Sequence, residues 1–151
     1  MNTPLDAQSI RNKIISLLAR REHSRAELHQ RLKSQAESIE LLNEVLDRMA
    51  QDGYQSDQRF TESFIRQRVS QYWGPKRIVF ELSQKGISKA MIDQVMEAMD
   101  PNWRDLAVGL AKKRFDNSIK PVPKEQAKRL RYLLNHGFSY DDAKNALDPE
   151  M

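Results

Sequence analysis

Few side chains that usually perform catalysis or bind metals occur in this chain of 151 residues, and their spacing favours neither role. The histidines are His23, His29 and His136, and none has a second histidine or paired carboxylates at metal-ligand spacing. The carboxylate pair Asp141–Asp142 follows Ser139, a candidate helix N-cap, where acidic side chains favour the helix dipole. We therefore expect no catalytic activity, no metal and no cofactor.

Cysteine and glycine offer no further reactive site. The chain contains no cysteine, which excludes disulfides and thiol nucleophiles and agrees with a reducing compartment. Of the five glycines, four stand where a helix is expected to begin or end, and none belongs to a phosphate-cradling loop. The N-terminal segment does not resemble a signal peptide, and no stretch approaches the roughly 18 apolar residues of a membrane span. We expect a cytoplasmic protein that does not bind a membrane.

Basic side chains are unevenly distributed and form the first candidate binding surface. The formal net charge is +4, and residues 104–136 contain nine basic and three acidic residues, whereas residues 1–103 are almost balanced. Such an excess suits the phosphates of a nucleic acid or an acidic protein, although charge runs are usually only solvated helix faces. The candidates here are Lys112, Lys113, Arg114, Lys120, Lys124, Lys128, Arg129 and Arg131.

The elements that carry these side chains are predicted to be helices. Thr3 and Pro4 predict the start of a helix over residues 4–21. Ser24 and Glu27 form a capping box for a short second helix. A third is expected over residues 38–51, before a left-handed stop at glycine 53.

The rest of the chain repeats this pattern. Ser56, Gly74-Pro75 and Ser88 each open a helix, and further helices are expected near residues 101–115, near residues 123–136 and after Ser139. No hairpin dipeptide is flanked by alternating apolar residues. The sequence therefore predicts an all-α fold.

Equivalent positions recur first after 50 residues and then after 51, which predicts a copied three-helix unit. Any three helical triplets would align apolar with apolar, but here capping serines and stop glycines also coincide. We predict repeats over residues 1–53, 54–103 and 104–151, stacked as an elongated, curved array. The matching sets are Ile14, Phe64 and Phe115; Leu32, Leu82 and Leu133; Ser38, Ser88 and Ser139; Leu46, Met96 and Leu147; and Gly86 and Gly137.

The middle repeat carries the most particular motifs. It reads D-x-R-F from Asp57, R-x-R from Arg66, G-P-x-R-I from Gly74 and E-L-x-x-K-G-I from Glu81. In this order and spacing the segment closely resembles the RecX family of regulators of the RecA recombinase. The resemblance extends more loosely to residues 20–28 and to Gly137-Phe138. One departure is Gln71-Tyr72-Trp73, where the family often has a basic residue and a glycine before G-P.

The resemblance implies a cytoplasmic bacterial protein that binds the RecA filament along its groove and restrains strand exchange, ATP hydrolysis and coprotease activity. It also implies weak, non-specific binding to single- and double-stranded DNA, and we expect a monomer. Candidate contacts in the middle repeat are the basic residues Arg66, Arg68, Lys76, Arg77 and Lys85.

Aromatic and apolar residues of the same repeat have different expected roles. Tyr72 and Trp73 are either exposed aromatic anchors at an interface or parts of a packed turn. The residues expected in the core are Phe60, Phe64, Ile78 and Leu82.

Two other functions fit a helical chain without catalytic residues. A helix, a Gly-Pro turn and a second helix superficially resemble a helix-turn-helix, which would indicate a sequence-specific DNA-binding regulator. Against this, the following helix is too acidic to enter the major groove, since its candidate base-reading side chains are Lys89, Asp93, Gln94 and Glu97. The third possibility is a helical scaffold that binds another protein and no nucleic acid.

Overall fold

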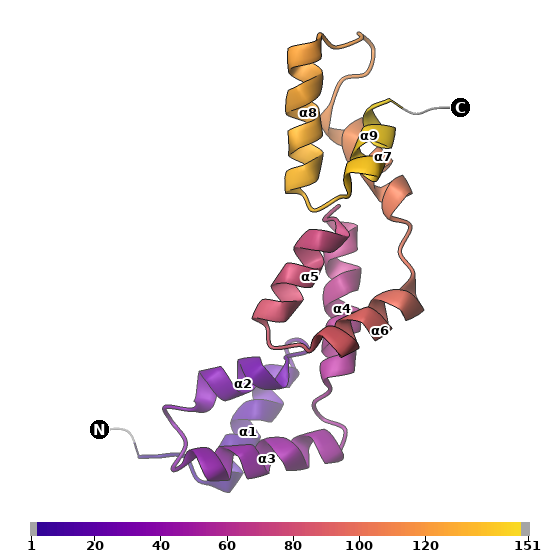
Figure 1. Cartoon of the computed structure of the whole chain (residues 1–151). Coiled ribbons are helices and arrows are strands. Elements are labelled where there is room, and N and C mark those ends of the chain that lie inside the picture. The colour runs from indigo at the N-terminus through magenta and orange to yellow at the C-terminus, as the bar shows by residue number, and fades with distance from the viewer. Residues whose placement is uncertain (1–2, 149–151) are drawn as a thin grey trace. The chain divides into compact units, whose positions relative to one another are not determined.

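The computed structural model describes residues 3–148, which form nine α-helices and no strand (Figure 1). The all-α prediction is therefore confirmed. In chain order the helices are α1 (Ala7–Leu18), α2 (Arg25–Leu32), α3 (Ile39–Gln51), α4 (Asp57–Ser70), α5 (Pro75–Gln84), α6 (Lys89–Met99), α7 (Trp103–Arg114), α8 (Pro123–Asn135) and α9 (Tyr140–Leu147).

The chain divides into two compact units that do not follow the repeat boundaries. The first unit comprises residues 1–63 and 82–95, and the second comprises residues 64–81 and 96–151. Helices α4, α5 and α6 each contribute residues to both units. The three domains over residues 1–53, 54–103 and 104–151 stay a prediction.

The first unit is built around the apolar faces of α1, α2 and α3. Its N-caps are largely those expected, because Ser24 and Glu27 form the capping box and Ser38 Oγ accepts the N–H of Leu41. Gly53 ends α3 with φ 81°, as predicted. The buried core consists of Ile10, Ile14, Leu28, Leu32, Leu42, Val45, Leu46 and Met49.

The start of the first helix was predicted wrongly. Asp6, not Thr3, is the N-cap of α1, and its carboxylate accepts the N–H of Ser9 at 2.9 Å. Leu5 lies in extended backbone, because its N–H donates to the carbonyl of Gln35 at 2.8 Å and its carbonyl accepts the N–H of Glu37 at 3.0 Å. The two backbone hydrogen bonds of Leu5 hold the segment before Asp6 out of the helix.

The second unit contains a corresponding core between α7, α8 and α9. Pro123 occupies the first turn of α8, and Ser139 Oγ caps α9 by accepting the N–H of Asp142. Gly137 lies between these two helices with φ 95°. The core residues are Ala107, Leu110, Ala111, Leu133, Phe138, Ala143 and Ala146.

Capping and burial in the middle repeat also follow the prediction. Ser56 Oγ accepts the N–H of Arg59 at 3.1 Å, and Ser88 Oγ accepts that of Met91 at 3.2 Å. Gly86 has φ 81°. The expected core residues are all buried, namely Phe60, Phe64, Ile78 and Leu82.

Candidate partner-binding surface

The thirteen basic residues predicted to contact a partner fall into two groups in the structure. Six of them pack against a carboxylate or an aromatic ring, so they have a role within the fold: Arg68, Arg77, Lys85, Lys113, Arg114 and Arg129. The other seven have no side-chain hydrogen bond or ion pair within residues 3–148: Arg66, Lys76, Lys112, Lys120, Lys124, Lys128 and Arg131.

Arg68 and Arg77 share one carboxylate in the second unit. Arg68 Nη2 lies 3.1 Å from Glu81 Oε2, and Arg77 Nε lies 3.3 Å from Glu81 Oε1. Arg68 also lies over the ring of Phe64, 4.3 Å from its centroid. Burial opposes ionisation of Glu81, but the hydrogen bonds and charges of the two arginines outweigh it, so its pKa lies below the ordinary value. This motif arginine pair thus joins α4 to α5.

Trp73 begins a row of four aromatic rings in contact, of which only the first pair is stacked. The rings of Trp73 and His136 are parallel to within 14°, with centroids 4.4 Å apart. The ring centroid of Tyr132, on α8, lies 4.4 Å from that of His136. The ring of Phe115 meets that of Tyr132 edge-on, with centroids 5.4 Å apart. Of the two roles predicted for Trp73, the structure favours the packed turn, since the ring is only partly exposed.

Three arginines lie on this row of rings. Arg77 is 4.9 Å from the centroid of Trp73, and Arg114 is 5.4 Å from that of Tyr132. Arg129 lies 5.0 Å from the ring of Phe115 and 3.5 Å from the carboxylate of Glu125. Cation–π contacts of this kind restrain each guanidinium against the protein.

Tyr72 closes the end of α4 against α7. Its φ is 66°, a left-handed conformation that few residues other than glycine adopt. Its ring covers Gly109 so closely that a Cβ there would meet Tyr72 Cε1 at 3.1 Å. Lys113 Nζ also lies over the ring of Tyr72, 5.0 Å from its centroid. Tyr72 is therefore a packed residue, and Gly109, which has no part in a helix end, provides room for it.

Lys85 forms an ion pair with a carboxylate in the first unit, as Arg68 and Arg77 do in the second. Its Nζ lies 3.3 Å from Glu27 Oε2, and its carbonyl accepts the hydroxyl of Ser24 at 2.8 Å. Burial alone would raise the pKa of Glu27, but hydrogen bonds from Arg21, Ser24 and Lys85 lower it below the ordinary value. Lys85 thus joins the stop of the middle repeat to the start of α2.

The same junction occurs once in each unit, at positions related by the repeat. In the first unit the start of α2 at Ser24 meets the stop at Lys85 and Gly86. In the second unit the N–H of Gly74, 50 residues after Ser24, donates at 2.6 Å to the carbonyl of His136, 51 residues after Lys85. The two contacts differ in their donor, a hydroxyl in the first unit and a backbone N–H in the second, but each links segments of neighbouring predicted repeats within one compact unit.

Three of the seven predicted contact residues without a side-chain partner lie on α8. Lys124, Lys128 and Arg131 are exposed and follow one another at intervals of four and three residues, which places them on one face of the helix. We call these three residues the α8 stripe. Of the other predicted contact residues without a side-chain partner, Arg66 lies on α4, Lys76 on α5, Lys112 on α7 and Lys120 between α7 and α8. The α8 stripe is the candidate partner-binding surface.

Sequence reasoning missed the ring row on α8. His136 and Tyr132 carried no motif of their own, and Phe115 was seen only as an equivalent of Ile14 and Phe64. A signal did exist, because His136 occupies the position equivalent to Lys85 directly before a stop glycine. The contact between Trp73 and His136 joins the middle and third repeats, so the sequence of either repeat alone could not predict it.

Within residues 3–148, no three side chains of the usual ligand types lie close enough together to hold a metal ion. No helix in the same part of the chain is long and apolar enough to span a bilayer.

Family models match two of the three predicted repeats. Residues 56–96 match the second three-helix domain of RecX, and residues 104–147 match its third three-helix domain. The chain belongs to the RecX family. Together the two matches cover more than half of the chain and confirm the family suggested by the motifs of the middle repeat.

Relatives named as RecX regulatory proteins extend the match over nearly the whole chain. The regulatory protein RecX of Pseudomonas putida is 38% identical over 141 residues, which are 93% of this chain and 88% of that protein. That of Chromohalobacter salexigens is 37% identical over 137 residues, 91% of this chain and 90% of that protein. RecX is thus a family of regulatory proteins rather than of enzymes.

Solved RecX structures share the fold. The crystal structure of RecX from Lactobacillus salivarius is 25% identical and superposes with a TM-score of 0.82, covering 95% of this chain and 97% of that chain. A second RecX crystal structure, 23% identical, gives a TM-score of 0.74 over 97% of this chain and 79% of that chain.

Proposed function

We propose that this protein binds the RecA nucleoprotein filament and negatively modulates its recombinase, ATPase and coprotease activities. Membership of a family of regulatory proteins supports a regulatory role, and the motifs of the middle repeat resemble those of RecA regulators. Binding to DNA is expected to be weak and non-specific, and the protein is expected to be a monomer that stays in the cytoplasm.

The α8 stripe is the observation that carries this proposal. Its three cations are exposed and lack side-chain partners within the described residues, so each can approach an anionic surface without breaking an existing contact. A nucleoprotein filament offers such a surface through its phosphates, and each phosphate contact releases counterions. By contrast, Arg68 and Arg77 would have to leave Glu81 before they could contact a partner.

The alternative of a sequence-specific DNA-binding regulator has less support. Lys89 at the start of α6 is paired with Asp93, with 2.7 Å between Nζ and Oδ2. Lys89 is the only basic residue of α6, and a helix whose single cation lies beside a carboxylate is poorly suited to reading base edges. A mobility-shift assay with and without RecA separates the two functions, since tight binding to one duplex sequence without RecA would favour the regulator.

Filament binding tests the role of the α8 stripe. Lys124→Gln/Lys128→Gln/Arg131→Gln should bind RecA filaments on single-stranded DNA roughly tenfold more weakly than the wild type, because three charge contacts are lost. The control Lys33→Gln/Arg48→Gln/Lys89→Gln removes the same charge from exposed positions of the first unit. Equal weakening by both variants would mean that only net charge matters and would contradict a role for α8.

A further inference from the structure

A basic hollow lies in the first unit between α1 and α2, and none of the basic residues predicted from the sequence lines it. It has a volume of about 400 Å³ and is open to solvent. Three cations line it: Lys13 lies within α1, Arg20 lies two residues beyond the end of α1, and Arg31 lies on α2. We call it the α1–α2 hollow.

The positive charge of this hollow is not balanced locally. No carboxylate lines it, and Lys13, Arg20 and Arg31 are all exposed. Among the described residues, none of the three side chains has an ion pair or a hydrogen bond. Like charges held close together repel one another, and an anion seated between them would relieve this repulsion.

Helix geometry holds the three cations in place. Lys13, Ser16 and Arg20 recur at intervals of three and four residues, so they follow one side of α1 and its final turn. Arg20 lies just beyond the last residue of the helix, where its N–H still donates to the carbonyl of Leu17 at 3.1 Å. Arg31 extends from α2, which is fixed to α1 through the buried core.

The remaining lining suits an oxyanion rather than a planar base. Ser16, Asn12 and Gln35 provide polar groups, and the Oδ1 of Asn12 already accepts from Gln8 at 3.0 Å, which leaves its amide N–H groups free to donate. Leu17 and Leu32 complete the lining, which contains no aromatic ring on which a base could stack.

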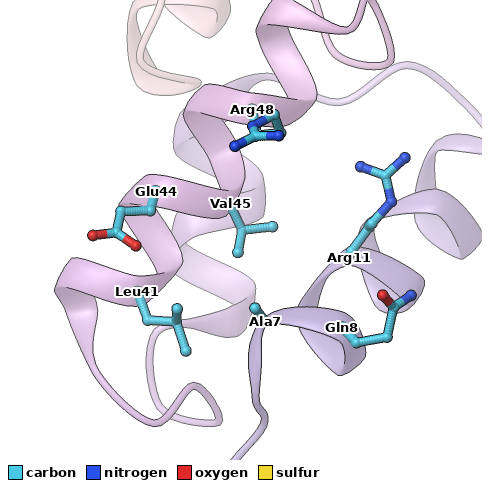
Figure 2. A pocket seen from close by; sticks show the side chains of 7 residues that line it. All are labelled: Ala7, Gln8, Arg11, Leu41, Glu44, Val45 and Arg48. Atoms are coloured by element: carbon cyan, nitrogen blue, oxygen red, sulfur yellow. The ribbon is translucent and has the colours of Figure 1, made fainter.

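A second groove of the first unit is also lined by basic residues, but it differs from the α1–α2 hollow because a carboxylate lines it. Figure 2 shows the groove between α1 and α3, with Arg11 on α1 across from Val45 and Arg48 on α3. Glu44 lines this groove as well, and Arg11 is already placed 3.8 Å from Asp52. This groove therefore contains a carboxylate and an arginine that is already paired, whereas no carboxylate lines the α1–α2 hollow.

We infer that the α1–α2 hollow binds a phosphoryl group, supplied either by the backbone of a nucleic acid or by a small phosphate compound. Guanidinium groups bind phosphate oxygens in a bidentate geometry, and a third cation with two or three neutral donors completes the shell. The inference does not depend on RecA, because it concerns a site within the first unit alone.

Titration of the ¹⁵N-labelled full chain without RecA tests the site. Tripolyphosphate and a single-stranded oligonucleotide are added in separate experiments, and the amides of Ser16, Leu17 and Gln35 and the side-chain Nε–H signals of Arg20 and Arg31 are followed. Shifts with both ligands indicate a general phosphoryl site, and shifts with the oligonucleotide alone assign it to a strand backbone. The absence of shifts at these positions with either ligand would overturn the inference.

Matched variants separate this site from general charge effects. Followed at the backbone amides of Ser16, Leu17 and Gln35, Arg20→Gln/Arg31→Gln should bind roughly tenfold more weakly, and Arg20→Lys/Arg31→Lys should restore part of the binding. Lys33→Gln/Arg48→Gln, which removes the same charge from exposed residues that do not line the hollow, should bind as the wild type does. Equal loss in both glutamine variants, with unchanged thermal unfolding, would also overturn the inference. Filament binding is measured separately, so a negative result here leaves the proposed function standing.

Discussion

At the scale of single residues, a basic side chain in a family motif is not necessarily a contact for a partner. Arg68 and Arg77 belong to the motifs that identify the family, yet both hold Glu81, whose side chain is only 22% exposed. Lys124 and Lys128 belong to no motif and remain free of side-chain partners within residues 3–148. Charge variants at the first pair would therefore disturb the fold before they tested binding.

Removing the shared carboxylate should destabilise the second unit. Glu81→Gln is expected to lower the free energy of unfolding by about 1 kcal/mol, because a partly buried acceptor of two charged hydrogen bonds is lost. Glu97→Gln is the control, since Glu97 is exposed and has no side-chain partner in the described chain. Chemical denaturation followed by circular dichroism measures both, and equal stabilities would contradict the structural role of Glu81.

His23 should make the stability of the first unit depend on pH. Burial, and then the charge of Arg21, hold the pKa of His23 below its ordinary value of 6.5. The unfolded chain therefore binds the proton more readily, so stability is full above about pH 6.5 and falls as the pH drops toward the folded-state pKa. Denaturation between about pH 5 and 7 should show this fall.

The matched variants for this prediction differ in which histidine they retain. His29→Gln keeps His23 and should show the same fall in stability with pH as the wild type. His23→Gln should flatten the profile in this range whatever its absolute stability, because the titrating group is gone. A wild-type profile that is flat below about pH 6.5 would contradict the prediction.

At the scale of elements, the stop glycines differ in what surrounds them. Gly53 and Gly137 both have positive φ, but a Cβ on Gly53 would have open space, whereas one on Gly137 would meet the backbone N of Arg77 at 2.6 Å. Gly137 thus serves both the helix end and the junction with α5.

Alanine substitutions separate these two roles. Gly53→Ala should cost about 1–2 kcal/mol of stability, the strain of a left-handed residue. Gly137→Ala should cost a further 1–3 kcal/mol or so, because the extra methyl group forces the junction apart. Thermal or chemical unfolding of the two variants provides the comparison. A smaller loss for Gly137→Ala than for Gly53→Ala would contradict the junction.

Helices and most of their caps could be predicted from local sequence, because a cap depends on residues within one turn. Ser24, Ser38 and Ser139 each cap the helix expected. The predicted N-cap at Thr3 is wrong because Leu5 forms backbone hydrogen bonds with the segment after α2, about thirty residues further along the chain. The sequence could not decide between an exposed and a packed Tyr72 for the same reason, since Gly109, the glycine that its ring covers, lies on α7.

The binding surfaces were less predictable than the helices. The sequence located the basic excess in the third repeat, where the α8 stripe lies, but could not show which cations are already paired. Counting charges along the sequence could not predict the α1–α2 hollow, because residues 1–103 are nearly neutral as a group. Its cations come from two helices that only the fold brings together.

At the scale of the whole molecule, the helical RecX fold is proposed to regulate its partner through binding contacts rather than through catalysis. The repeat places a junction in each unit, and the junctions occupy the motif residues of the middle repeat. The cations of α8 remain available for a filament. Regulation by binding alone predicts that inhibition follows occupancy of the filament and weakens with salt.

The most direct test is the ATPase rate of RecA on single-stranded DNA, titrated with the wild-type chain, with strand exchange measured in parallel. We predict that hydrolysis and exchange both fall while the added chain is still outnumbered by RecA subunits. Hydrolysis and strand exchange at the uninhibited rates, on filaments shown by co-sedimentation to carry the bound chain, would contradict the account.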